Sequence, residues 1–139
     1  MSLYVAASLR AYAALARGDT VSATRLFDAL PDSLPISIPF DLFTRARLIG
    51  RQDPRRAIEI LERHSGADLL YPARELERGR LAEKIGDKER AVDAYSFVAT
   101  VWQSADAGPL RDAAKEASDA LTRLDSDGRM RAQLSGVKR

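Results

Sequence analysis

Apolar residues recur along most of the chain at intervals of three and four positions, the spacing of amphipathic helices. Glycine, proline and Asp or Thr caps interrupt this pattern at regular points. The helices that the pattern predicts cover residues 3–17, 21–30, 42–51, 54–64, 68 or 71 to 85, 88–104 and 110–124. A two-residue alternation occurs only at Leu34, Ile36 and Ile38, in a connector with three prolines, and no strand is predicted there or elsewhere. The sequence therefore predicts an all-α fold.

A second pattern is superimposed on the helices, because three short stretches recur at intervals of 34 residues. Each contains an aspartate, an alanine four positions later and a large apolar residue four positions after that. These residues are Asp19, Ala23 and Phe27, then Asp53, Ala57 and Leu61, then Asp87, Ala91 and Tyr95. A period of about 34 is typical of a solenoid built from helix-turn-helix repeats.

The recurring aspartates stand where the second helix of each repeat should begin, and aspartate is a favoured N-cap. Asp19 or its neighbour Thr20 can cap the first of these helices, and Asp53 precedes a proline, which suits the first helical position. Asp41 is interpreted in the same way, as the cap of the helix predicted over 42–51. The pattern predicts three antiparallel helix pairs that stack into a right-handed solenoid, since no pair can bury its apolar side alone. The final helix, over 109–125, is expected to cap the third pair.

With the helices placed, the chain resembles the tetratricopeptide repeat (TPR) family over roughly residues 3–125. The third repeat carries the resemblance best: Gly79 is the small residue at a close helix crossing, Gly86 makes the turn, Ala91 is a small contact and Tyr95 fills the space between helices. Ala82 stands where the family usually has an aromatic residue. This repeat also looks like repeat regions of longer bacterial signalling proteins, including serine/threonine kinases, although the chain contains no kinase motif.

The other two repeats follow the TPR pattern unequally. The first matches well, with Ala11, Ala14, Gly18, Ala23 and Phe27. The second has Arg45 where a small residue is expected and Gln52 in place of the turn glycine, with Gly50 two positions early. A proline-rich connector over residues 31–39 also precedes it. We expect its first helix to be short or shifted.

Composition narrows the class of protein. The chain has 139 residues, no cysteine and a net charge of +2, which suits one globular domain without disulfides or thiolate chemistry. Its basic excess lies in residues 126–139, which carry Arg129, Arg131, Lys138 and Arg139 against Asp127. We predict that residues 1–125 form the TPR-like domain and that this basic tail is disordered. Four charges argue against a nucleic-acid partner.

Other candidate chemistry is sparse. The chain has no apolar stretch long enough to cross a membrane and no secretory signal pattern, so a cytoplasmic location is expected. His64 is the only histidine and lies at a predicted helix end, where capping or packing explains it. The glycines are isolated rather than grouped in a phosphate loop, and the three aspartates are explained as caps. We predict no enzymatic activity, no metal and no cofactor.

The resemblance to TPR proteins implies a partner-binding site. In that family the first helices of the pairs form a concave face that binds extended or helical peptide segments. Carried onto this sequence, the face comprises Val5, Ser8, Tyr12, Leu15, Leu42, Ala46, Ile49, Leu76, Arg80 and Glu83. Recognition of a terminal carboxylate, known in some members, is not supported by these residues. The alternative is that the apolar members of this set are only core residues.

The first predicted helix suggests a second kind of contact. Between Leu3 and Ala16 its only charge is Arg10, whereas a terminal solenoid helix normally has a polar outer face. It could be an ordinary core helix, it could pack on an upstream part of a longer parent, or it could mediate self-association. We therefore predict a protein-interaction scaffold that binds a peptide or partner protein. The alternative is a dimerisation or structural segment whose first helix packs on itself or on a parent chain.

Overall fold

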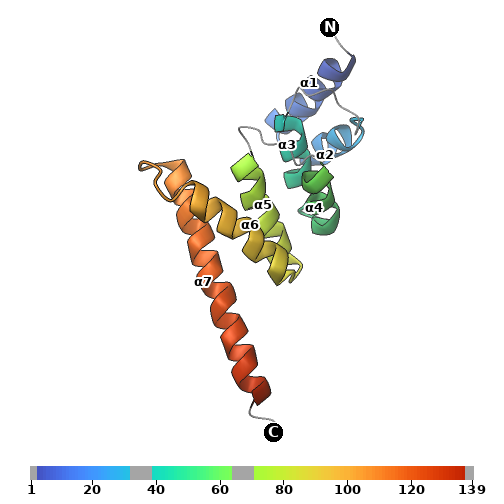
Figure 1. Ribbon diagram of the computed structural model, residues 1–139. Coiled ribbons are helices and arrows are strands. Elements are labelled where there is room, and N and C mark those ends of the chain that lie inside the picture. The colour runs from blue at the N-terminus through green and yellow to red at the C-terminus, as the bar shows by residue number, and fades with distance from the viewer. Residues whose placement is uncertain (1–2, 32–38, 64–70, 137–139) are drawn as a thin grey trace. The chain divides into compact units, whose positions relative to one another are not determined.

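The computed structural model describes residues 3–31, 39–63 and 71–136, with the side chains of 39, 71 and 128–136 excepted. Within these ranges the chain is helical and has no strand, which confirms the all-α prediction. The helices are α1 (Leu3–Ala16), α2 (Thr20–Asp28), α3 (Pro39–Ile49), α4 (Pro54–Arg63), α5 (Tyr71–Lys84), α6 (Lys88–Val101) and α7 (Pro109–Gly136) (Figure 1).

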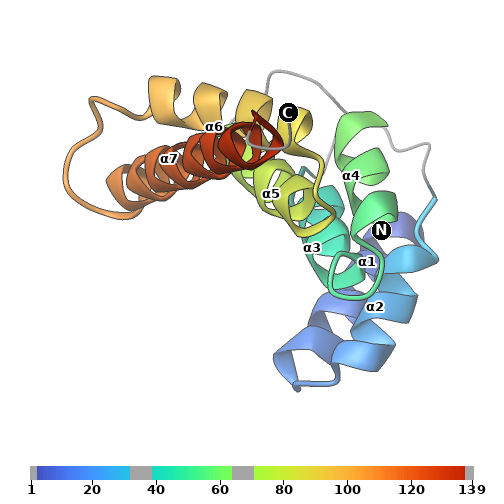
Figure 2. The ribbon, with the colours of Figure 1, turned by 90° about the horizontal axis from the view of Figure 1, so that it is seen from below.

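The helices fall into two compact units. Unit 1 is Met1–Leu70 and unit 2 is Tyr71–Arg139. In unit 1, α2 packs on α1 and on α3, and α3 packs on α4. In unit 2, α6 packs on both α5 and α7, and Figures 1 and 2 show α7 running alongside α6.

The recurring aspartates begin three of the helices in the same way. Each carboxylate accepts a hydrogen bond from the backbone N–H three residues later, which satisfies one of the free donors of the first turn. The pairs are Asp19 with Ser22 at 3.0 Å, Asp53 with Arg56 at 3.0 Å and Asp87 with Arg90 at 3.1 Å. The capping role read from the sequence is confirmed for these aspartates, and Asp19 rather than Thr20 caps α2.

The turns between paired helices distinguish the second repeat from the other two. Gly18 and Gly86 both have a φ of +76°, the left-handed conformation in which glycine ends a helix. The turns at these glycines close with a bond to the carbonyl five residues back, as in Asp87 N–H to Ala82 at 2.9 Å. The second repeat has Gln52 instead, and Asp53 N–H reaches only four residues back, to Ile49 at 2.8 Å.

Each unit has its own apolar core. In unit 1 the rings of Tyr12 and Phe27 meet edge to face with centroids 4.9 Å apart. The buried residues around them are Ala11, Ala14, Ala23, Leu30 and Leu48. In unit 2 the Tyr95 ring covers Gly79 so closely that a β-carbon there would lie 2.7 Å from it. The roles of Gly79 and Tyr95 at a close crossing are therefore confirmed.

Three predicted boundaries were wrong. α7 continues to Gly136, so the part of the basic tail over 126–136 is helical rather than disordered. Gly128 opposes a helix by only about 1 kcal/mol, and the Arg, Met, Ala, Gln and Leu residues that follow are good helix formers. α3 begins at Pro39, which places Asp41 inside the first turn rather than at the cap. α6 ends at Val101, three residues early. His64 and the connector residues 32–38 lie outside the described residues.

Candidate functional site

A polar cluster in unit 1 joins α1 to α3. The Tyr4 hydroxyl donates a short hydrogen bond to Oδ2 of Asp41, and the hydroxyls of Tyr12 and Thr44 lie 3.3 Å apart. Tyr4 and Tyr12 are two turns apart on α1, and Asp41 and Thr44 are one turn apart on α3, so each pair lies on one face of its helix. We call these four residues the Tyr–Asp cluster.

Burial and the nearby carboxylate set the protonation of this cluster. Asp41 is only 1% exposed, and its second oxygen, Oδ1, has no hydrogen-bond partner. Burial raises the pKa of Tyr4 well above its ordinary value, and the hydrogen bond to Asp41 raises it further. Burial also raises the pKa of Tyr12, with the Asp41 carboxylate adding to the rise and the hydrogen bond to Thr44 opposing it. Both phenols therefore keep their protons at neutral pH.

The predicted concave residues of unit 1 divide by exposure. Val5 is 36% exposed, and Tyr12, Leu15 and Leu42 are half-buried. Ser8, Ala46 and Ile49 are buried within the chain and do not present a contact surface. The accessible part of the predicted set in unit 1 is thus apolar and aromatic, and it includes one member of the Tyr–Asp cluster.

Arg45 is a buried cation that, together with Asp28, links three helices of unit 1. Its side chain is buried where a small residue was expected, and its guanidinium reaches the Asp28 carboxylate at 3.2 Å and the Asp28 carbonyl at 3.4 Å. Asp28 also accepts from Arg56 at 2.6 Å. These bonds hold α3 and α4 to the last residue of α2, where the helix dipole favours a cation.

The residues of α5 that were predicted to contact a partner differ from those of α1 and α3, because the charged ones are bonded to α7. Arg80 donates two hydrogen bonds of 2.6 Å to Glu116 on α7, and Arg123 of α7 donates to Glu83 at 3.1 Å. Glu83 also accepts from the Tyr95 hydroxyl at 2.8 Å. Leu76 is buried. The charged groups predicted for partner contact on α5 are therefore engaged by α7.

These contacts also shift the ionisation of the groups involved. The hydrogen bonds from Arg80 lower the pKa of the Glu116 carboxyl, because they favour its charged form. The same bonds raise the pKa of Arg80. Burial raises the pKa of Tyr95, and its hydrogen bond to the Glu83 carboxylate adds to this effect.

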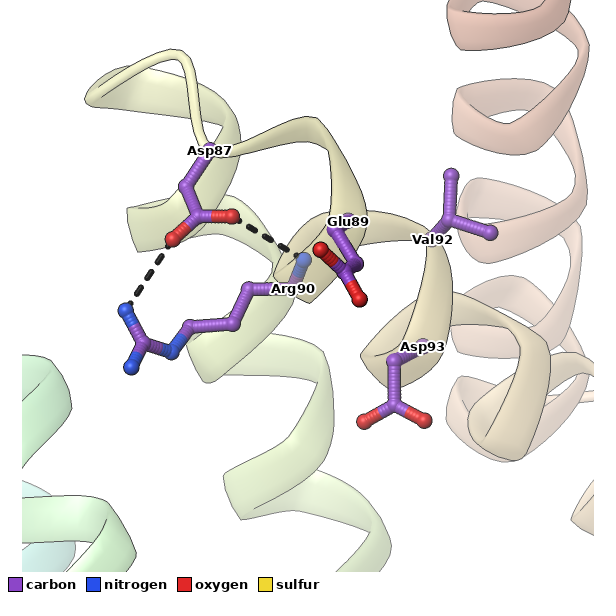
Figure 3. Close-up of a pocket in the computed structure, with 5 residues that line it drawn as sticks. All are labelled: Asp87, Glu89, Arg90, Val92 and Asp93. Atoms are coloured by element: carbon purple, nitrogen blue, oxygen red, sulfur yellow. Dashed lines mark hydrogen bonds and ion pairs between the residues drawn. The ribbon is translucent and has the colours of Figure 1, made fainter.

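The start of α6 borders a shallow hollow of 680 Å³ (Figure 3). Asp87, Glu89, Arg90, Val92 and Asp93 line it. Figure 3 shows the Asp87 carboxylate bonded to both the backbone N–H and the guanidinium of Arg90. Asp93 accepts from Arg78 at 2.6 Å. Two of the three acidic groups are thus engaged inside unit 2, and the hollow shows no arrangement of nucleophile and base.

In the part of the chain that the structure describes, no group of three or more His, Cys, Asp or Glu side chains converges as a metal site would require. None of the described helices has the length and apolar character needed to cross a membrane. Comparison of the chain with protein-family models, with curated proteins and with solved structures gives no significant match.

Sequence reasoning found Tyr12 but missed the rest of the Tyr–Asp cluster. Asp41 was interpreted as the N-cap of the helix predicted over 42–51, a local role that gives no sign of a partner on α1. The available signal was the pair of tyrosines two turns apart on a helix whose only charged residue is Arg10. Such a pair needs polar partners when it is buried.

Proposed function

We propose that this protein is a non-enzymatic interaction module of the TPR kind, with antiparallel helix pairs in a solenoid, and that α1 and α3 bind a peptide segment of a partner. The proposal rests on the half-buried side chains of Tyr12, Leu15 and Leu42 beside the Tyr–Asp cluster. They combine apolar surface with hydroxyl groups, a composition common at peptide-binding surfaces. A cytoplasmic location accords with this role.

The contrast with unit 2 supports the choice of α1 and α3. Arg80 and Glu83, the polar members of the predicted face on α5, already bond to α7. A peptide there would have to replace ion pairs made within unit 2. On α1 and α3 it would cover apolar side chains that are partly in water, which is favourable.

Peptide selection tests this proposal. Random peptides displayed on phage would be selected on the full chain, and the enriched sequences synthesised and measured by fluorescence anisotropy. We expect at least about tenfold weaker binding to a Tyr12→Ala/Leu42→Ser variant, because two central contacts are lost. Val21→Ser is the matched control, since Val21 is 79% exposed on α2. Equal losses in both variants, or binding unchanged in the double variant, would contradict the proposal.

One observation favours a second function, self-association through α1. Three apolar residues of α1 are exposed: Leu3 at 91%, Leu9 at 55% and Val5 at 36%. Val5 and Leu9 are one turn apart and form an apolar stripe along the helix. Arg10 is the only charged residue of α1. An uncharged stripe on a single helix can pack on a copy of itself, with the small contact area of a weak dimer.

Sedimentation velocity over a range of concentrations separates the two functions. A dimer formed through α1 would dissociate in Leu9→Lys, because the new charge would be buried at the contact. The Tyr12→Ala/Leu42→Ser variant would still dimerise. A strict monomer at the highest concentration would exclude self-association and leave peptide binding standing.

A further inference from the structure

A groove with a volume of 510 Å³ runs along α2 in unit 1. One of its walls is a face of α2 between Thr20 and Ala29. The other wall consists of Leu48, near the end of α3, and of Arg51 and Gln52 in the turn that leads to α4. These residues all belong to unit 1, where α2 packs on α3, so the groove lies within one compact unit.

Apolar side chains line part of this groove. Leu48 is 6% exposed and belongs to the core of unit 1, whereas Val21 is 79% exposed and Ala29 is also exposed. An apolar side chain of a partner that packed on Val21 would remove apolar surface from water, which is favourable. The groove therefore favours a ligand that carries apolar as well as polar groups.

The polar part of the lining is rich in hydrogen-bond donors. Arg25 on α2 and Arg51 in the turn are both exposed and bring two guanidinium groups to the groove. The exposed amide of Gln52 can donate as well. Because a guanidinium group can donate two parallel hydrogen bonds to one carboxylate, this lining suits a ligand with carboxylate groups.

The nearby carboxylates do not offset the charge of these arginines. Asp28 lines the groove, but its Oδ1 atom accepts from Arg45 at 3.2 Å and from Arg56 at 2.6 Å, so two further arginines neutralise it. Asp19, at the start of α2, accepts the capping bond from the backbone N–H of Ser22. The groove thus has an excess of positive charge, which favours an anionic ligand.

The lining favours an acidic peptide over a nucleic acid. Nucleic acids are bound mainly through many contacts with phosphates, and two lining arginines neutralise at most about two of them. The Thr24 hydroxyl donates to the Thr20 carbonyl at 2.7 Å, so its proton is already used within α2. A peptide can combine a carboxylate for the arginines with an apolar side chain for Val21.

We propose that this groove binds an acidic segment of a partner protein, with glutamate or aspartate carboxylates bonded to Arg25 and Arg51 and an adjacent apolar side chain packed on Val21. This inference goes beyond the proposed function, because Tyr12 and Leu42, which carry that function, do not line the groove. The two surfaces also differ in chemistry, since the groove along α2 recognises charge.

Matched capped peptides test this proposal on the full chain. Their sequence is Ser-X-Leu-X-Ser, where both X residues are glutamate, glutamine or lysine, and a short oligothymidine represents nucleic acid. Binding is measured by amide chemical shifts of the ¹⁵N-labelled protein. We expect the glutamate peptide to bind at least about fivefold more tightly than the glutamine peptide, with shifts centred on Val21, Thr24 and Gln52, and the lysine peptide to bind most weakly. The preference for glutamate should shrink at about 0.5 M NaCl.

Two double variants identify the cations. Arg25→Gln/Arg51→Gln should remove the preference for glutamate over glutamine. Arg10→Gln/Arg55→Gln is the matched control, because it removes two positive charges from exposed positions on α1 and α4 that do not line the groove, and it should keep the preference. Arg25→Gln alone should lower the preference at least about twofold and provides an independent measurement if the double variant fails to fold.

The outcomes that would overturn the proposal are distinct. Equal binding of the glutamate and glutamine peptides would exclude recognition of carboxylates, and equal losses in the two double variants would show only an effect of general charge. Tighter binding of the oligothymidine than of the glutamate peptide would assign the groove to nucleic acid. Shifts confined to α1 and α3 would place the acidic peptide outside the groove. None of these results would contradict peptide binding on α1 and α3, which is tested separately with Tyr12→Ala/Leu42→Ser.

Discussion

Tyr12 and Arg80 occupy equivalent positions two repeat periods apart, and each bonds to another helix of its own unit. In unit 1 the bond is neutral and joins the hydroxyls of Tyr12 and Thr44 on α3, which lie 3.3 Å apart. In unit 2 it is ionic, from the Arg80 guanidinium to Glu116 on α7 at 2.6 Å. Equivalent positions of the repeat therefore make a contact with another helix in both units, but the contact is a neutral hydrogen bond in unit 1 and an ion pair in unit 2.

The same difference is found one helical turn further on, at Leu15 and Glu83. Leu15 packs against the apolar core of unit 1, whereas its counterpart Glu83 accepts from Arg123 and Tyr95. Unit 1 therefore keeps apolar and hydroxyl groups on the face of α1 and α3, while the ion pairs of unit 2 close between its own helices. The comparison teaches that equivalent positions of one repeat pattern can carry apolar and hydroxyl groups in one unit and internal ion pairs in the other.

The largest expected effect tests whether the two units have separate cores. Phe27→Ala removes a ring that is fully buried between α1 and α2, which should destabilise unit 1 by about 3–5 kcal/mol. Hydrogen exchange should show loss of amide protection in α1, α2 and α3 and retained protection in α5, α6 and α7. Val21→Ala, on the exposed side of α2, should change stability by less than about 0.5 kcal/mol. Equal loss of protection in α6 and α7 would show that the units do not behave separately.

The next largest effect is expected where α5 and α6 approach closely, at Gly79 and Tyr95. A β-carbon at Gly79 would lie 2.7 and 2.8 Å from two carbons of the Tyr95 ring. Gly79→Ala should therefore lower the free energy of unfolding by about 1–2 kcal/mol, although alanine favours a helix by about 1 kcal/mol over glycine. Urea unfolding measures the change.

The control for this crossing is taken from the second repeat, which has Leu61 at the position of Tyr95. In a Tyr95→Leu background, Gly79→Ala should be less harmful, and the double variant should be more stable than the sum of the single changes implies. A gain in stability from Gly79→Ala in the wild-type background would refute the close approach.

The salt dependence of stability distinguishes the Arg80–Glu116 ion pair from the Tyr12–Thr44 hydrogen bond. Arg80 and Glu116 are 43% and 41% exposed, so water weakens their ion pair, and Arg80→Gln should lose only about 0.5–1 kcal/mol at low salt. That loss should shrink at about 1 M NaCl. Tyr12→Phe should lose a similar amount at both salt concentrations, since the bond to Thr44 is neutral. Urea midpoints at low and high salt measure both, and equal salt responses would contradict the contrast.

The sequence predicted the fold better than the site, for physical reasons. Capping by Asp19, Asp53 and Asp87 involves residues only three positions away, so the local sequence was sufficient to predict it. The close contact between Gly79 and Tyr95 was predicted from their positions in the repeat. The Tyr–Asp cluster depends on contacts between residues 37 positions apart, such as Tyr4 and Asp41, which no local pattern reports. The engagement of Arg80 by Glu116, 36 positions away, was missed for the same reason.

The end of α7 was missed for a different reason. Asp127 and Gly128 have the composition of a helix stop, yet a single glycine opposes a helix by only about 1 kcal/mol. The helix formers on either side outweigh it. Composition alone was therefore a poor guide to where this helix ends.

The smallest expected effect concerns the protonation of Glu116. Arg80 lowers the pKa of this carboxyl, so the pair stabilises the folded state above the ordinary glutamate pKa of about 4.3. That contribution is lost as the pH falls through the lower pKa of the folded state. Titration followed by the ¹³C carboxyl signal should find the pKa of Glu116 below its ordinary range in the wild type and closer to it in Arg80→Gln.

Lys115→Gln is the matched control for this titration, because Lys115 bonds to Asp119 at 2.7 Å on the same helix. It removes one positive charge beside Glu116 in the sequence but leaves the bond from Arg80 in place. A pKa of Glu116 that rises equally in both variants would mean that general positive charge on α7, rather than the bond from α5, holds the carboxylate ionised. The bond from Arg80 would then no longer account for the low pKa of Glu116.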